Sequence, residues 1–260
     1  MGGTVVLVTD YGQSDHYAAS LVGICLRVDP ELRVEHGTHG VPFGDVLAAA
    51  YHLSALASDY PAGTVFCGVV DPGVGTDRGA IAIEAAGVRC VAPDTGLVHW
   101  VWEDAAHAER SAVRLPIPAD AAPTFHGRDV FAPAAARLAA GALLHELGEP
   151  QVAPRLLDAA RVVDDGDEVV CRVAVVDRFG NVVTTFRRRD LGDDELLGAR
   201  WRGGETMTVA RTFAEIADDV ALVVGGSGHI ELAADARSAA LMSGLRPGDE
   251  VRILLRREAA

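Results

Sequence analysis

The stretch GTVFCGVVDPGVGTDRGA (residues 63–80) joins an apolar run to a glycine-rich turn that carries charged side chains. The run GTVFCGVV at its start has the composition of a β-strand that is buried on both faces. Strands of this kind belong to sheets covered by helices, in which ligands bind beyond the carboxyl ends of the strands. The stretch therefore predicts a helix-covered sheet, with Asp71 at the edge where functional groups lie.

Strands and helices alternate on both sides of this stretch. The run TVVLVT (4–9) is again a buried strand followed by a polar turn, and Asp10 ends it as Asp71 ends the run above. This alternation favours a largely parallel sheet, so we expect an N-terminal parallel-sheet α/β domain. The remaining expected strands are 32–36, 80–85 and 88–92, and the expected helices are 15–28, 45–58 and 129–141, with a further helical stretch over 95–105.

The pattern changes after about residue 160. Short apolar runs are interrupted there by Gly, Asp and Arg, which is the signature of a small antiparallel barrel or sandwich. We expect two domains: an α/β domain over residues 1–160 and a small C-terminal antiparallel β-barrel over residues 161–260. The expected strands of the second domain are 168–177, 181–186, 206–210, 220–225, 229–234 and 250–257.

The composition disfavours several classes of protein. The chain has 23 Lys and Arg residues against 37 Asp and Glu residues, a net charge of -14, and such a field repels phosphate backbones. The N-terminus lacks the basic and apolar regions of a signal peptide, and no apolar run reaches the roughly 20 residues that span a bilayer. We therefore expect a cytoplasmic protein with neither a nucleic-acid nor a membrane partner.

The cysteines show no metal-ligand spacing. They are scattered along the chain without a CxxC pair, which predicts buried reduced thiols and no metal site. The four are Cys25, Cys67, Cys90 and Cys171.

Three residues stand out as candidates for chemistry. Asp71 follows a buried strand, Arg78 returns after the Pro-Gly-Val-Gly turn, and His126 lies in TFHGRDVFAP (124–133). Each has an ordinary alternative: Asp71 and Arg78 could form a surface ion pair, and a single histidine is more often a bystander. The neighbouring Asp129, directly before a helical pattern, is expected to cap that helix.

The second half of the chain contributes two further polar segments. Asp177 and Asn181 flank a Phe-Gly turn in VVDRFGN (175–181), a pair that a plain hairpin turn would also favour. Ser227 lies in GGSGHIEL (225–232), for which a flexible loop is the default interpretation.

Taken together, these motifs resemble those of a known family. VTDYG, VVDPGVGTDR, APDTGL, TFHGRDVFAPAAARLAAG and VVDRFGN occur in this order and spacing in the S-adenosylmethionine hydroxide adenosyltransferases, or S-adenosylmethionine hydrolases, relatives of the fluorinases and chlorinases. The resemblance runs from about residue 5 to residue 257. It implies an N-terminal α/β domain, a C-terminal β-barrel, and a homotrimer whose active site lies at the subunit interface.

The resemblance also implies roles for individual residues. The catalytic trio of the family maps onto Asp71, Arg78 and His126. The substrate-binding positions map onto Asp10 for the ribose hydroxyls, Asn181 for the adenine edge, Asp177 for the methionine ammonium, Asp15 as an assisting residue, and Ser227 and Glu231 as lining residues. Around Ser227 the chain is one residue shorter than the family pattern, and Thr95 stands where an asparagine is usual.

The implied reaction is hydrolysis of S-adenosyl-L-methionine to adenosine and L-methionine, by attack of water or hydroxide at ribose C5′ without a cofactor. The halogenating relatives carry other residues at the positions of Asp71 and His126, and an insertion that they have after residues 80–85 is missing here. Gly127, in contrast, matches the chlorinases. Two alternatives stay open: a chlorinase-type halogenase, and an adenosine-binding trimer without catalysis.

Overall fold

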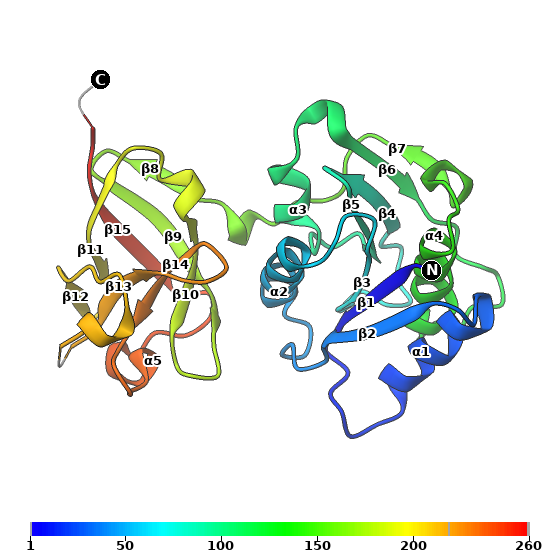
Figure 1. Cartoon of the computed structure of the whole chain (residues 1–260), viewed down its shortest axis with the longest axis horizontal. Helices are drawn as coiled ribbons and strands as arrows, with labels where there is room; N and C mark the ends of the chain where they lie inside the picture. The colour runs from blue at the N-terminus through cyan, green and yellow to red at the C-terminus, as the bar shows by residue number, and fades with distance from the viewer. Residues whose placement is uncertain (1, 218, 259–260) are drawn as a thin grey trace. The chain divides into compact units, whose positions relative to one another are not determined.

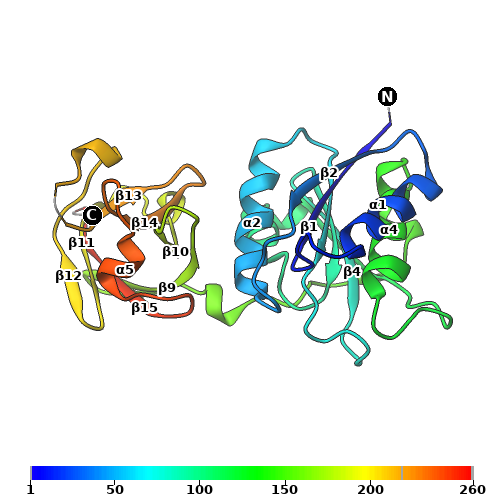
Figure 2. The same ribbon diagram turned by 90° about the horizontal axis from the view of Figure 1, so that it is seen from below.

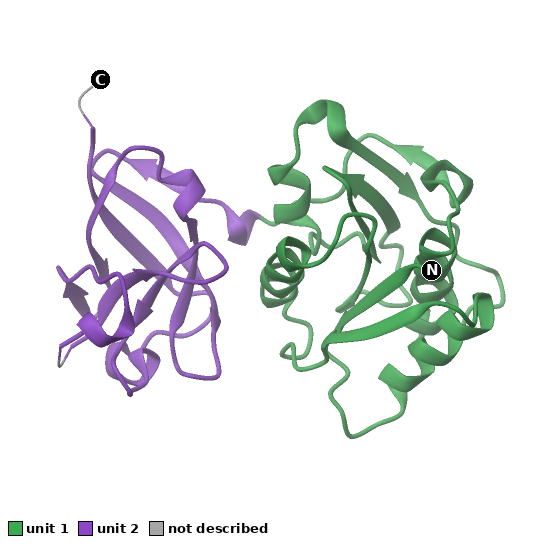
Figure 3. Cartoon of the chain, viewed as in Figure 1, with its two compact units in different colours: residues 1–157 green, residues 158–260 purple. Residues whose placement is uncertain are grey.

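The computed structural model describes residues 2–217 and 219–258, and the chain divides into two compact units. Unit 1 comprises residues 1–157 and unit 2 residues 158–260 (Figure 3). The boundary expected from the sequence, between residues 160 and 161, lies slightly later. No helix among the described residues is both long and apolar enough to cross a bilayer.

Unit 1 is built on a seven-stranded mixed sheet with the strand order β2-β1-β3-β5-β4-β6-β7 (Figure 1). The expected parallel arrangement holds for β2, β1, β3 and β5. The sheet is completed by antiparallel pairs, β4 with β5 and with β6, and β6 with β7; β6 and β7 were not among the expected strands. The bounds are β1 Thr4–Thr9, β2 Arg33–Thr38, β3 Val65–Val69, β4 Ala80–Ala85, β5 Val88–Pro93, β6 Arg110–Arg114 and β7 Glu149–Gln151.

The antiparallel pairing of β4 with β5 has a local cause. Only Ala86 and Gly87 link the two strands, and both have positive φ, 48° and 80°. Two left-handed residues in succession form the tight hairpin turn that suits the twist of paired strands. A parallel pair would need a crossover of a dozen or more residues, so this short link makes the pair antiparallel.

Helices cover both faces of this sheet. α1 and α4 pack on one face and α2 with α3 on the other (Figures 1 and 2). Val5 and Leu7 of β1 belong to the core that faces α1 and α4, and every residue from Val5 to Val8 is fully buried. The bounds are α1 Tyr17–Val28, α2 Val46–Asp59, α3 His99–Asp104 and α4 Ala132–Ala139, the last preceded by a π-helical turn over Gly127–Phe131.

Unit 2 is a nearly closed antiparallel sheet. Its strand order is β12-β11-β15-β9-β10-β14-β13, with β8 added beside β9. The segment after β12 meets β13 at the other end of the order, because Ala210 N–H donates to Leu222 O and Leu222 N–H donates to Thr208 O. The bounds are β8 Val163–Asp165, β9 Glu168–Val176, β10 Val182–Arg187, β11 Glu195–Trp201, β12 Gly204–Thr206, β13 Ala221–Val224, β14 His229–Ala233 and β15 Glu250–Arg256, with a short helix α5 Ala239–Ser243.

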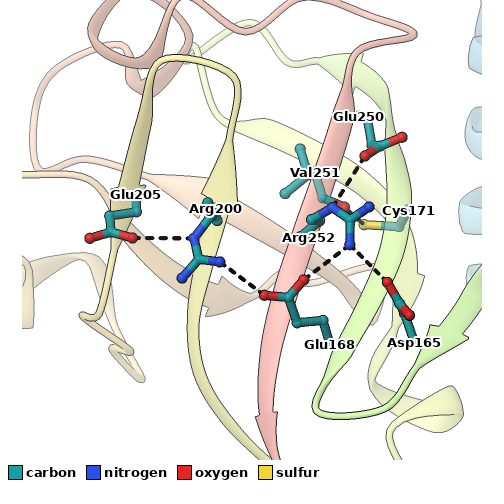
Figure 4. Close-up of polar contacts among 8 residues, drawn as sticks. All are labelled: Asp165, Glu168, Cys171, Arg200, Glu205, Glu250, Val251 and Arg252. Carbon is teal, nitrogen blue, oxygen red and sulfur yellow. Dashed lines mark hydrogen bonds and ion pairs between the residues drawn. The ribbon is translucent and has the colours of Figure 1, made fainter.

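Strand β11 was not expected from the sequence, and its outer face carries a charged network. Arg200 of β11 stands directly opposite Arg252 of β15, a like-charge pair that by itself disfavours the pairing. Glu168 of β9 accepts from both, at 3.1 Å from Arg200 Nη1 and 3.1 Å from Arg252 Nη1 (Figure 4). Asp165 and Glu205 complete this network of partly exposed side chains. The carboxylates of β8, β9 and β12 thus offset the two arginines and make β11 compatible with the sheet.

Candidate active site

Asp71 and Arg78 form a buried ion pair across the turn that follows β3. Arg78 Nε donates to Asp71 Oδ1 at 2.8 Å, and Arg78 Nη2 donates to Asp71 Oδ2. The two side chains are only 7% and 9% exposed, so the surface pair considered from the sequence is excluded. Gly75 allows the chain to reverse at φ 79°, which returns Arg78 to the end of the strand. A fork-shaped pair at this depth fixes both side chains in one geometry.

His126 joins this pair from a distant part of the chain. Its Nδ1 lies 2.8 Å from Arg78 Nη2, and because a guanidinium only donates, Nδ1 is the acceptor. The proton of the neutral ring is therefore on Nε2. Burial lowers the pKa of His126, and the positive charge of Arg78 lowers it further. The ring is thus held neutral with one nitrogen free to donate.

The segment around His126 is a π-helical turn rather than the capped helix start expected from the sequence. Asp129 lies inside this turn and does not cap it, so that expectation is wrong. Its carboxylate instead accepts from Ala122 N–H at 2.8 Å and from Arg128 Nε at 2.6 Å. Asp129 thereby ties the turn to the preceding loop. π-Helical turns are frequent at functional sites.

A cavity of about 350 Å³ opens beside the buried pair in unit 1. Asp10, at the end of β1, lies on its wall and accepts from Gly44 N–H at 2.9 Å. Burial raises the pKa of the Asp10 carboxyl, and the nearby charge of Asp71 adds to the rise. The wall of the cavity includes the candidate residues Asp10, Asp15, Asp71 and His126. Residues that were not candidates also line it, among them Tyr11, Phe43 and Thr124.

Asp177 and Asn181 lie together at the turn between β9 and β10 of unit 2. Asp177 Oδ1 accepts from the backbone N–H of Phe179 and of Asn181, at 2.9 and 2.8 Å. Asp177 Oδ2 accepts from Asn181 Nδ2 at 2.9 Å, so the carboxylate also orients the Asn181 amide. The hairpin-turn interpretation accounts for the backbone contacts but not for this last one.

Asn181 lines a cavity of about 520 Å³ in unit 2. Phe179 and Phe213 also line it, and they are 78% and 49% exposed. Exposed aromatic faces beside an oriented amide suit a flat heteroaromatic ring, which can stack and be read at its edge. Neither phenylalanine was among the candidate site residues, although Phe179 stands inside the motif VVDRFGN.

Ser227 and Glu231 lie elsewhere in unit 2. Ser227 is exposed in the turn between β13 and β14, and neither residue lines the cavity of Asn181. Glu231 is buried in β14 and packs against Gly225. A side chain at position 225 would overlap the Glu231 carboxylate. Burial raises the pKa of Glu231 to about 7, and the negative charge of Asp177 contributes to the rise. No group of three or more His, Cys, Asp and Glu residues in the described ranges is arranged to hold a metal ion.

The SAM hydroxide adenosyltransferase family matches this chain twice, with its N-terminal domain over residues 5–148 and its C-terminal domain over residues 171–252. The chain belongs to this family. A Salinispora tropica protein named (R)-S-adenosyl-L-methionine hydrolase is 40% identical, over 96% of this chain and 97% of its own length. A Nocardia brasiliensis fluorinase is 27% identical, over 96% of each chain. The crystal structure of an uncharacterized conserved protein from Thermotoga maritima has a TM-score of 0.85 and 30% identity, over 96% of this chain and 99% of that one.

Proposed function

We propose that this protein hydrolyses S-adenosyl-L-methionine to adenosine and L-methionine, by attack of water or hydroxide at ribose C5′. The observation that carries the proposal is the contact of Asp71, Arg78 and His126 in one group beside the cavity of Asp10. The 40% identical relative that is named a hydrolase supports it, as does the lower identity to a fluorinase, 27%.

The reaction needs a positioned nucleophile more than an acid. The sulfonium leaves as the neutral thioether of methionine, so no group has to protonate it and no cofactor is required. Both oxygens of Asp71 retain a lone pair after binding Arg78, and one of them accepts a hydrogen from the attacking water. Arg78 stabilises the negative charge that develops on the water, and the Nε2–H of His126 donates to it. Placing the water in line with the C5′–S bond accelerates the reaction further.

Substrate binding uses the remaining site residues. Asp10 accepts from the ribose hydroxyls, as one carboxylate can do with its two oxygens. Asn181 reads the adenine edge between the two exposed phenylalanines of its cavity, and Asp177 orients the Asn181 amide. Asp15, Ser227 and Glu231 serve in binding at the periphery, with the negative charge of Asp177 available for the methionine ammonium.

The test is incubation with S-adenosyl-L-methionine in chloride-free buffer, with products followed by liquid chromatography. We expect adenosine and methionine in equal amounts, and a loss of at least about 100-fold in kcat for Asp71→Asn. Asp77→Asn is the matched control, because Asp77 is exposed in the same turn. A wild-type protein that binds adenosine without turnover would refute hydrolysis. Formation of 5′-chloro-5′-deoxyadenosine on addition of chloride would assign a halogenase instead.

We propose further that the active enzyme is a cytoplasmic homotrimer whose site lies at the subunit interface. The exposed side chains of Phe43, 94%, and Phe179, 78%, support a surface that another subunit covers. The test mixes two inactive variants, Asp71→Asn and Asn181→Ala, under conditions that allow subunits to exchange. Recovery of activity in the mixture, with a trimer mass by light scattering, supports a shared site. Absence of recovery despite exchange would mean that each subunit builds its own.

A further inference from the structure

Tyr11 is a polar residue of the unit 1 cavity that the mechanism above does not use. It directly follows Asp10, and its backbone N–H donates to Thr9 Oγ1 at 3.2 Å. Its ring packs edge-on against Phe125, with centroids 6.1 Å apart, and near Tyr17 at 5.8 Å. These contacts hold the ring on the cavity wall that Asp71 and His126 share.

The Tyr11 hydroxyl is placed against the backbone next to His126. A Cβ built on Gly127 would overlap the hydroxyl oxygen of Tyr11. The next nearest atoms, Val69 Cγ1 and Leu21 Cδ2, would be 3.3 and 3.4 Å away, tight but adjustable distances. The Tyr11 oxygen is therefore the main obstacle to a side chain at position 127. Glycine at position 127 leaves the space that the Tyr11 hydroxyl occupies.

The chemistry of this hydroxyl suits a water molecule. In the ranges that the structure describes, no protein donor or acceptor is paired with it. Burial raises the pKa of Tyr11, and the charges of Cys67, Asp10 and Asp71 add to the rise, so the phenol stays neutral. A half-buried hydroxyl without a protein partner is satisfied by water or by a ligand.

We propose that Tyr11 is a positioning residue for the nucleophile, its oxygen accepting one hydrogen of the attacking water; this inference rests on the proposed function. A water that attacks C5′ through one lone pair has three other bonding directions. Asp71 accepts one hydrogen of the water and Tyr11 accepts the other, while the Nε2–H of His126 donates to the second lone pair of the water oxygen. With all three directions occupied, the attacking lone pair has one orientation.

The test compares Tyr11→Phe with Tyr60→Phe. Tyr60 packs on Phe66, with centroids 5.8 Å apart, and is not among the residues that line the Tyr11 cavity, so removing its hydroxyl leaves kcat unchanged. Tyr11→Phe keeps the ring and its packing, and we expect kcat to fall about tenfold with KM changed less than about twofold. An unchanged kcat, or a rise in KM alone, would overturn the inference while the hydrolase stands. A wild-type protein without turnover would overturn both.

A second comparison checks the placement of the hydroxyl without using activity. Gly127→Ala should lower the melting temperature of the wild-type protein, because the new Cβ overlaps the Tyr11 oxygen. In the Tyr11→Phe background the same change should be tolerated, since only the atoms at 3.3 and 3.4 Å remain. Equal destabilisation in the two backgrounds would show that the oxygen does not lie over Gly127, and the inference would fail.

Discussion

Replacing Glu231 by glutamine should change how the stability of unit 2 depends on pH. Glu231 is 6% exposed in β14, and burial with the charge of Asp177 raises its pKa from 4.5 to about 7. Between these two pH values the folded protein keeps a proton that the unfolded chain has released. The free energy of unfolding of the wild type therefore falls as pH rises through this window and loses nothing further above it.

The size of the effect follows from the distance between the two pKa values. Each pH unit between them is worth about 1.4 kcal/mol, so the whole penalty reaches about 3 kcal/mol above pH 7. Glutamine has nearly the same shape and does not titrate, so Glu231→Gln removes the penalty. From pH 5 to pH 8 the wild type should lose about 2–3 kcal/mol more than the variant does.

The assay is denaturant unfolding of both proteins at pH 5 and pH 8, followed by the amide exchange of β14 so that unit 2 is observed separately. Glu205→Gln is the matched control, because Glu205 is 59% exposed on β12 and pairs with Arg200 at 3.3 Å. Its unfolding free energy should follow that of the wild type within about 1 kcal/mol at both pH values. Parallel pH profiles for Glu231→Gln and the wild type would mean that Glu231 is ionised in the folded protein, and the reasoning would be refuted.

Three further outcomes are expected. Gly180→Ala should destabilise unit 2 by about 2 kcal/mol or more, because φ is 87° and the new Cβ would lie 2.7 Å from Ser238 Cα; thermal melts against Gly203→Ala, whose Cβ would have no neighbour within 4 Å, measure the excess. The rate should be flat above neutral pH and fall only on acidification below the ordinary histidine range, because burial and Arg78 lower the pKa of His126 and its protonation would break the hydrogen bond that Nδ1 accepts from Arg78; a kcat/KM profile that rises on acidification would contradict this. In the native protein the thiols of Cys25, Cys67, Cys90 and Cys171 should not react with Ellman's reagent at pH 8, but all should react in guanidinium. All four are buried, and burial raises the pKa of each thiol, to about 11 for Cys25 and to about 12 for Cys171.

Several features of the protein followed from local sequence alone. The apolar runs that end at Asp10 and Asp71 predicted two buried strands, and β1 and β3 pair in parallel so that both carboxylates reach one edge. Periodicity suffices here because a strand buried on both faces is apolar at every position, whereas a helix repeats every 3.6 residues. The change of pattern near residue 160 likewise indicated a second, antiparallel unit.

Local pattern was insufficient where charge or pairing depends on distant residues. Strand β11 was not predicted, and its pairing places Arg200 opposite the like-charged Arg252, which Glu168 offsets only once the sheet has formed. The burial of Glu231 could not be predicted either, because the residues next to it in the sequence do not show which side chains will pack around it. Ser227 entered the list of candidates by its resemblance to the family, and the structure places it on an exposed turn.

The sequence by itself singled out Asp71, Arg78 and His126 as candidates for the chemistry, because each lies in a short recognisable motif. Only the tertiary structure decided what they do to one another. Arg78 and His126 are 48 residues apart, and their contact at 2.8 Å assigns the proton of the ring to Nε2. Protonation states and hydrogen-bond directions depend on burial and on neighbours across the fold, and these exist only after the chain has packed.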